Sequence, residues 1–151
     1  MVVFIGGVLA LGTAVGVPAT GIPEFLKVTF EPLLGGLPEY AFVFVLMLAV
    51  IVATGVMSNL VCVSIFVPLG LTLAMGLGIG DPLAIGVLLG IGPSLDYLLP
   101  SGSTTNPMVA ASGWMRVGVM LRLGLVVALV HALVTTFFSY PLAKAILPAV
   151  A

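Results

Sequence analysis

The sequence predicts an all-α integral membrane protein, and three observations support this fold class. Hydrophobic residues make up 62% of the chain and charged residues 6%, with a mean hydropathy of +1.40. A soluble domain of 151 residues cannot bury that much apolar surface.

The second observation is a long uncharged run. No charged residue lies between Glu39 and Asp81, and a helix of that length would be about 60 Å long, twice the ~30 Å hydrocarbon core. Finally, Pro100 and the small, polar residues that follow it to Asn106 interrupt an apolar region. Backbone groups there need partners, which predicts a broken helix that lines a site.

Charge and motifs exclude several classes of function. The formal net charge is −1, which indicates neither a nucleic-acid partner nor electrostatic docking to a membrane surface. The lone Cys62 allows no internal disulfide. The sequence contains no nucleophile–base set, cluster of metal ligands or Walker-type loop, so we expect the protein not to be an enzyme.

The first two elements precede the uncharged run. Residues 1–17 are apolar and predict a helix of about 25 Å, slightly shorter than the hydrocarbon core. Residues 18–38 mix Glu24, Lys27 and Glu31 with apolar side chains. This pattern is typical of an amphipathic segment that lies at the membrane interface.

The uncharged run predicts a helical hairpin over residues 40–77. It is too long for one crossing and must fold back, and Ser58-Asn59 is its only adjacent polar pair. Because Asn tolerates left-handed backbone geometry and often closes turns, we place the hairpin tip at residues 58–59. The two arms, Tyr40–Met57 and Leu60–Leu77, are either re-entrant or fully spanning. We interpret the polar pair as part of a site, with a simple turn as the alternative.

The last two elements are a broken helix over residues 83–113 and a final span over residues 117–140. An apolar helix must stop at Pro100, and a second apolar piece starts at Pro107. Both pieces are needed for one crossing, so we prefer a break at 100–106 within the membrane to a loop that reaches the interface. The final span would be about 36 Å long, so we expect it to be tilted.

The cations are divided equally between the two sides of the membrane. Counting the crossings places Lys27, Asp81 and Lys144 on one side and Arg116 and Arg122 on the other. Two cations on each side give no positive-inside bias. The sequence therefore does not fix its own orientation.

The hairpin tip and the break carry the motifs of a known family. The signature at the break is a serine, an aromatic residue three positions later, a proline three further, then small residues, an asparagine and an apolar pair. The chain has these residues at Ser94, Tyr97, Pro100, Gly102, Asn106, Met108 and Val109. Together with the Ser58-Asn59 tip, they resemble the divalent anion/sodium symporter (DASS) family, whose members carry dicarboxylates, citrate or sulfate. The resemblance is to the second of that family's two inverted repeats, and no second copy of either motif marks a first repeat in this sequence.

The resemblance implies a sodium site between the hairpin tip and the break. Sodium is a hard cation that prefers several oxygen ligands, and in such sites they come from carbonyls and short side chains. The implied sodium ligands are Thr54, Met57, Asn59, Gly102 and Thr104. The anionic substrate would meet Ser58, Asn59 and Ser103. Leu60 departs from the family pattern, because the family has a hydroxyl-bearing residue there for the substrate.

Two ionisable residues at depth in the membrane are candidates for coupling. Asp96 comes one turn before Pro100, where a carboxylate is costly and usually has a function or a partner. It either supplies a charge for cation or proton coupling, or hydrogen-bonds the break and caps the second half-helix. His131 lies near the middle of the last span. It either pairs with Asp96 or shuttles protons, or else it is a hydrogen-bonded packing residue.

Half of an inverted-repeat transporter cannot enclose a site by itself, so we expect a partner. The partner is a second copy inserted upside down or a chain resembling the first repeat, unless this chain is a fragment of a longer transporter. As a multi-pass protein of the cell membrane (the inner membrane in bacteria), it would take up a divalent anion with sodium, by the elevator-like movement that the resemblance implies. The alternative is a non-transporting membrane subunit that kept the fold and lost substrate binding, for which Leu60 is the main indication.

Overall fold

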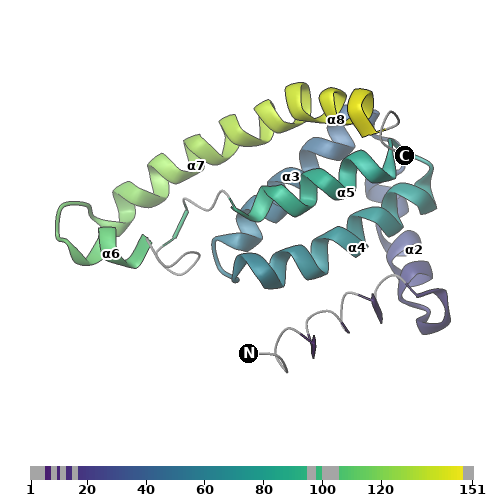
Figure 1. Ribbon diagram of the computed structural model, residues 1–151, viewed down its shortest axis with the longest axis horizontal. Helices are drawn as coiled ribbons and strands as arrows, with labels where there is room; N and C mark the ends of the chain where they lie inside the picture. Colours follow the sequence, from purple (N-terminus) through teal and green to yellow (C-terminus); the bar gives the residue numbers. More distant parts are fainter. Residues whose placement is uncertain are drawn as a thin grey trace.

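The chain is all-helical over the part that the structure describes. The computed structural model describes residues 6–7, 10, 13–14, 17–94, 98–99 and 106–147, and these form helices joined by turns, with no strand among them (Figure 1). In this part, two helices are long and apolar enough to cross a membrane, and a bent pair could supply a third crossing. The predicted fold class is confirmed. The apolar helix expected at residues 1–17 lies mostly outside the described residues.

Helix α2 (Ile22–Leu34) follows a short 3-10 turn, η1 (Pro18–Thr20). Gly21 precedes it with a φ of 69°, a left-handed conformation that glycine adopts without strain. The axis of α2 makes an angle of 116° with the next helix, and the aliphatic stem of Lys27 packs 3.6 Å from the position of a Cβ at Gly76. An interfacial position for residues 18–38 stays a prediction, and this sharp bend is compatible with it.

The predicted hairpin consists of α3 (Glu39–Thr54) and α4 (Asn59–Leu77). Helix α3 ends three residues before the expected Met57, and residues 55–58 form the turn. Asn59 is therefore not at the tip of the turn but is the first residue of α4, with Ser58 as its N-cap. Glycine at position 55 lowers helix propensity and also admits a close neighbour, which explains why α3 ends early.

Helix α5 (Pro82–Ile91) continues as a 3-10 turn, η2 (Gly92–Ser94). The sequence predicted this half of the broken helix to reach Leu99, but Leu99 is not helical. Pro93 explains the difference, because proline lacks the N–H that would continue the α-helical hydrogen bonds. After the break, α6 (Asn106–Ala111) is the short second piece.

The last span is longer than predicted. Helix α7 (Val117–Val134), the π-helical segment η3 (Thr135–Ser139) and α8 (Tyr140–Ile146) form one apolar helix of 30 residues. The sequence ended this span before Pro141. The π turn, in which the Tyr140 N–H bonds the Thr135 carbonyl, moves the hydrogen bonds on by one residue and accommodates the proline.

Along this long helix, a stripe of buried residues recurs every four positions. The members of this stripe are Met120, Gly124, Ala128, Ala132, Thr136 and Tyr140, and Thr135 beside Thr136 is buried as well. In an ideal α-helix a step of four residues rotates the face by about 40°, so such a stripe would wind away from its neighbour. The wider π turn reduces that rotation and helps to keep Thr136 and Tyr140 on the packed side.

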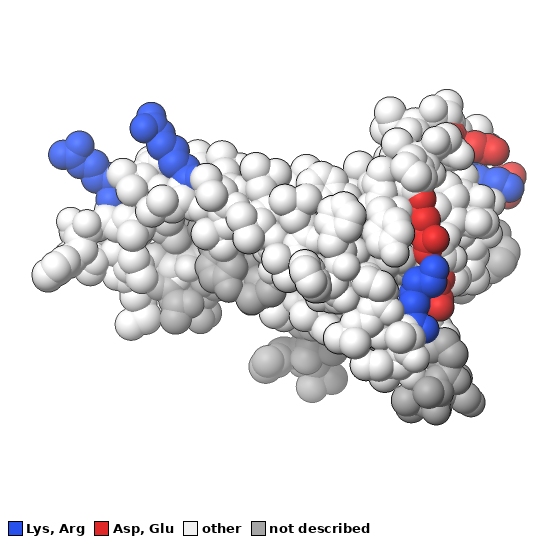
Figure 2. Space-filling view, turned by 90° about the horizontal axis from the view of Figure 1, so that it is seen from above, with Lys and Arg blue, Asp and Glu red and all other residues white. Residues whose placement is uncertain are grey.

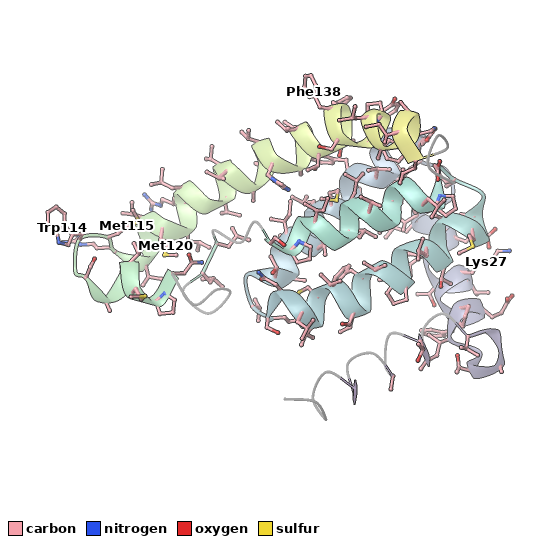
Figure 3. The ribbon with its side chains drawn as sticks, in the orientation of Figure 1. Lys27, Trp114, Met115, Met120 and Phe138 are labelled. Carbon is pink, nitrogen blue, oxygen red and sulfur yellow. The ribbon has the colours of Figure 1, made fainter. Side chains whose placement is uncertain are left out.

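The core lies where α3, α4 and α5 pack beside one another, with α7 and α8 crossing over α3 and α5 (Figure 1). Its largest fully buried side chains include Phe42, Met47, Ile51, Leu73 and Leu89. The outward faces are also apolar, and Phe138 projects away from the body (Figure 3) with 72% of its surface exposed. Apolar residues on both faces are expected of helices that contact lipid.

Charged residues gather at the two ends of the molecule (Figure 2). Basic side chains stand alone at one end, whereas acidic and basic side chains lie together at the other. Lys27 and Trp114 mark the two opposite ends (Figure 3). Arg116 is the N-cap of α7, and Lys144 lies 28 positions further along the same helix, about 42 Å away. The predicted division of the cations between the two sides of a membrane stays a prediction.

Candidate functional site

Three oxygen atoms converge where the hairpin tip meets the end of α5. The hydroxyl of Thr54 lies 2.8 Å from Asn59 Oδ1 and 3.2 Å from the carbonyl oxygen of Pro93. Thr54 is the last residue of α3, Asn59 the first residue of α4, and Pro93 lies in η2. Thr54 and Pro93 are both fully buried. The cluster therefore joins the two arms of the hairpin to the helix that leads into the break.

The Thr54 hydroxyl has fewer protons than its neighbours can accept. It carries one hydrogen, whereas Asn59 Oδ1 and the Pro93 carbonyl are both acceptors. With the Asn59 amide oriented as it is here, the Thr54 hydroxyl can therefore donate fully to only one of these two oxygens. A hydroxyl, a side-chain amide oxygen and a backbone carbonyl are ligand types suited to a hard cation, which interacts with several oxygens at once.

The hairpin turn and the residues before the break are in contact. A Cβ placed on Gly55 would lie 3.0 Å from the Cβ of Leu98, so the Leu98 side chain leaves little room for any side chain at position 55. Leu98 is itself buried, with 4% of its surface exposed. This contact brings the chain to the hairpin tip immediately before it enters the break.

Asn106 connects the two sides of the break. Its side-chain Nδ2 donates a hydrogen bond of 2.9 Å to the carbonyl of Leu99, and Asn106 is the first residue of α6. The chain therefore leaves at Leu99 and returns beside it seven positions later. This hydrogen bond holds together the two described ends of the break, and the position of the break within a membrane stays a prediction.

The structure describes only some of the residues predicted to form the site. Met57 and Ser58 are exposed in the turn, and Ser58 makes no side-chain capping bond to α4. Gly102, Ser103, Thr104 and Asp96 lie outside the described residues, so their predicted roles are untested. Thr54 and Asn59 are together, as the prediction requires, although their role as ligands also stays a prediction.

His131 in the last span makes no hydrogen bond to the Thr54 cluster among the described residues. Its Nε2 is buried and has no hydrogen-bond partner among the described residues, and the same is true of Thr136 Oγ1 in the π segment. Thr135 instead bonds back to the carbonyls of His131 and Ala132, at 2.8 and 3.1 Å. The sequence indicated an ionisable residue at depth in the last span, but it gave no sign of the π segment beside it.

The Pro93 carbonyl, which lies against Thr54, is not among the groups predicted from the sequence. The sequence predicts the oxygen atoms of the break at Gly102, Ser103 and Thr104, whereas Pro93 lies seven positions before Pro100. The signal was the Gly92-Pro93 pair, since a proline that shortens an α-helix leaves carbonyls without their usual donors.

Comparison with known proteins gives consistent matches over nearly the whole chain. Residues 1–144 match the family described as the sodium:sulfate symporter transmembrane region. The sodium-dependent high-affinity dicarboxylate transporter 3 of Caenorhabditis elegans is 29% identical over 98% of this chain and 25% of its own length. The Na(+)/citrate cotransporter of Rattus norvegicus is 31% identical over 83% of this chain and 21% of its own length. The sodium-dependent low-affinity dicarboxylate transporter 1 of C. elegans is 33% identical over 83% of this chain and 21% of its own length. The chain thus spans about a quarter of the length of these relatives.

Proposed function

This chain belongs to the sodium:sulfate symporter family, and we propose that it is the part of a secondary transporter that binds sodium and a small divalent anion. The family is one of multi-pass membrane transporters rather than enzymes. The substrate classes that we propose are dicarboxylates, citrate and sulfate. The proposed location is the cell membrane, which is the inner membrane in bacteria.

The observation that carries the proposal is the Thr54 cluster. One buried hydroxyl faces two acceptor oxygens from two other elements. We propose that a sodium ion, transported together with the anion, binds to these three oxygens. With the ion bound, Thr54 Oγ1, Asn59 Oδ1 and the Pro93 carbonyl would all turn lone pairs toward it. Without the ion, a rotated Asn59 amide would donate to Thr54, which would donate to Pro93. The cluster therefore has one arrangement for each state.

Asn59 is suited to couple the sodium ion to the anion. If its Oδ1 faces the cation, its Nδ2 is left to donate a hydrogen bond to an anionic oxygen. The Ser58 hydroxyl, which makes no capping bond, is the second proposed donor, and Ser103 is the third. A bound cation beside the anion also favours it electrostatically. Met57, Gly102 and Thr104 remain proposed as further sodium ligands.

The site needs a second half. Val56, Met57 and Leu60 expose 69%, 42% and 44% of their surfaces at the hairpin tip, so this side of the cluster is open in the chain alone. We propose that the remaining part of a longer transporter, a first-repeat chain or an inverted second copy completes the cavity. The hairpin and broken helix would then move past that part as an elevator.

A Thr54→Val substitution tests the proposal, with Thr54→Ser as the matched control. The complete transporter, including whatever segment or chain supplies the second half, would be reconstituted in vesicles. Uptake of labelled succinate, citrate and sulfate would be measured against sodium concentration. Valine removes the hydroxyl and keeps the shape, so we expect the half-saturating sodium concentration to rise at least about ten-fold, or about 1.4 kcal/mol. Serine keeps the hydroxyl, so we expect little change.

Two outcomes would contradict the proposal. One is an unchanged sodium dependence in Thr54→Val, which would exclude the cluster as the sodium site. The other is a folded, complete protein that binds none of the three anions in sodium, which would favour the alternative of a non-transporting subunit. Leu60 in place of a hydroxyl-bearing residue is the observation behind that alternative. Asp96 and His131 remain proposed for proton coupling, which would appear as uptake driven by a pH gradient without sodium.

A further inference from the structure

Tyr140 occupies the opposite end of α3 from Thr54 and is completely buried. Its hydroxyl donates to the carboxylate of Glu39, the first residue of α3. The same hydroxyl accepts a hydrogen bond of 2.9 Å from the backbone N–H of Asp81, the N-cap of α5. One oxygen atom therefore holds the starts of two helices that are 42 positions apart in sequence.

The same two helices are joined again at their far ends. Helix α3 extends about 22 Å from Glu39 to Thr54, and α5 with η2 runs in the same direction from Asp81 to Pro93. The Thr54 hydroxyl meets the Pro93 carbonyl there. Thus α3 and α5 lie in parallel between a tyrosine hydroxyl at one end and a threonine hydroxyl at the other.

The Tyr140 hydroxyl is held tightly in place. Lys144 Nζ lies 2.6 Å from Glu39 Oε1 and 5.4 Å from the centroid of the Tyr140 ring. The Tyr40 ring packs edge-on against the Tyr140 ring, with centroids 5.9 Å apart. Gly80 has a φ of 77°, and a Cβ on it would lie 2.7 Å from the hydroxyl oxygen. The loop before α5 is therefore shaped around this one atom.

We propose that Tyr140 is a positioning residue for the sodium site about 22 Å away. By fixing the start of α3 against the start of α5, it sets the register at which Thr54 reaches Pro93. Packed helices shift as rigid units rather than compress, so a slip at the Tyr140 end changes the oxygen spacing at the other end. Cation sites tolerate errors of only about 0.5 Å in ligand position. This inference rests on the proposed sodium role of the Thr54 cluster.

The test compares Tyr140→Phe with Tyr40→Phe in the complete transporter. The two rings are neighbours, and each substitution removes one hydroxyl and keeps the ring. The described structure gives the Tyr40 hydroxyl no hydrogen bond, so it serves as the control. We expect Tyr140→Phe to raise the half-saturating sodium concentration about five-fold, the equivalent of one hydrogen bond. We expect Tyr40→Phe to leave it within two-fold of the parent.

A second substitution and a second reading keep the test decisive. Glu39→Gln keeps an acceptor for the tyrosine but removes the charge, so we expect a smaller shift in the same direction. If Tyr140→Phe does not fold, Glu39→Gln takes its place. A lowered melting temperature with unchanged sodium dependence would show a structural role and overturn the inference. Because Thr54→Val is measured alongside, an effect of Thr54→Val without one at Tyr140 rejects this inference alone, and no effect at either position rejects the sodium site itself.

Discussion

We predict that Gly55→Ala pushes the segment before the break away from the hairpin tip. Gly55 has an ordinary right-handed helical backbone, with φ −61° and ψ −23°, so alanine fits the backbone without strain. The added methyl group, however, would lie 3.0 Å from the Cβ and 3.3 Å from the Cδ1 of Leu98. A Cβ cannot rotate away, because it is fixed to its own backbone. The segment at 98–99 would therefore have to move by several tenths of an ångström.

The two effects of this substitution oppose each other and can be compared. Replacing glycine by alanine in a helical conformation is worth about 0.5–1 kcal/mol in favour of the folded state. Overpacking of a tight site costs about 1–3 kcal/mol. We therefore expect Gly55→Ala to destabilise the protein by about 1–2 kcal/mol. Gly90→Ala is the matched control, because a Cβ on Gly90 has no atom within 4 Å, and it should be neutral or stabilising.

Thermal unfolding in detergent and sodium-dependent uptake would both be measured for the two glycine variants. Gly55→Ala should unfold at a lower temperature than the parent and require more sodium, because Leu98 and Leu99 lead directly into the break. Gly90→Ala should match the parent in both measurements. The reasoning is refuted if Gly55→Ala is as stable as Gly90→Ala and has the parent's sodium dependence.

Two further substitutions probe single polar groups. Asn106→Ala removes the hydrogen bond to the Leu99 carbonyl and should reduce uptake more than the ~1 kcal/mol stability loss of one hydrogen bond would suggest. Uptake at equal amounts of folded protein checks this, and proportional losses would contradict it. Thr136→Val replaces a buried hydroxyl that has no partner among the described residues with a group of the same shape. It should leave the melting temperature unchanged or raise it, whereas a clear decrease would indicate a hidden partner.

Much of the fold could be predicted because the membrane restricts the possible structures. A region without charge from residue 40 to 80 must fold back into helices, since no other open structure satisfies its backbone in lipid. The polar residues at the tip and the proline-flanked break then carry enough pattern to identify the family, which the comparison confirmed over residues 1–144. Helix ends were predicted less well, at Thr54, Ser94 and Ile146, because each depends on a glycine, a proline or a π turn in its local context.

The sequence by itself determined that this protein is helical, apolar on all sides and interrupted at two places, because those features follow from composition and from the backbone's need for hydrogen bonds. It also identified Thr54 and Asn59 as candidates. Only the tertiary structure decided that Thr54 faces Pro93, since that meeting depends on how far α3 slides along α5. No local pattern encodes the relative position of two packed helices. It is set by contacts between distant residues, and here one of them is the hydroxyl of Tyr140.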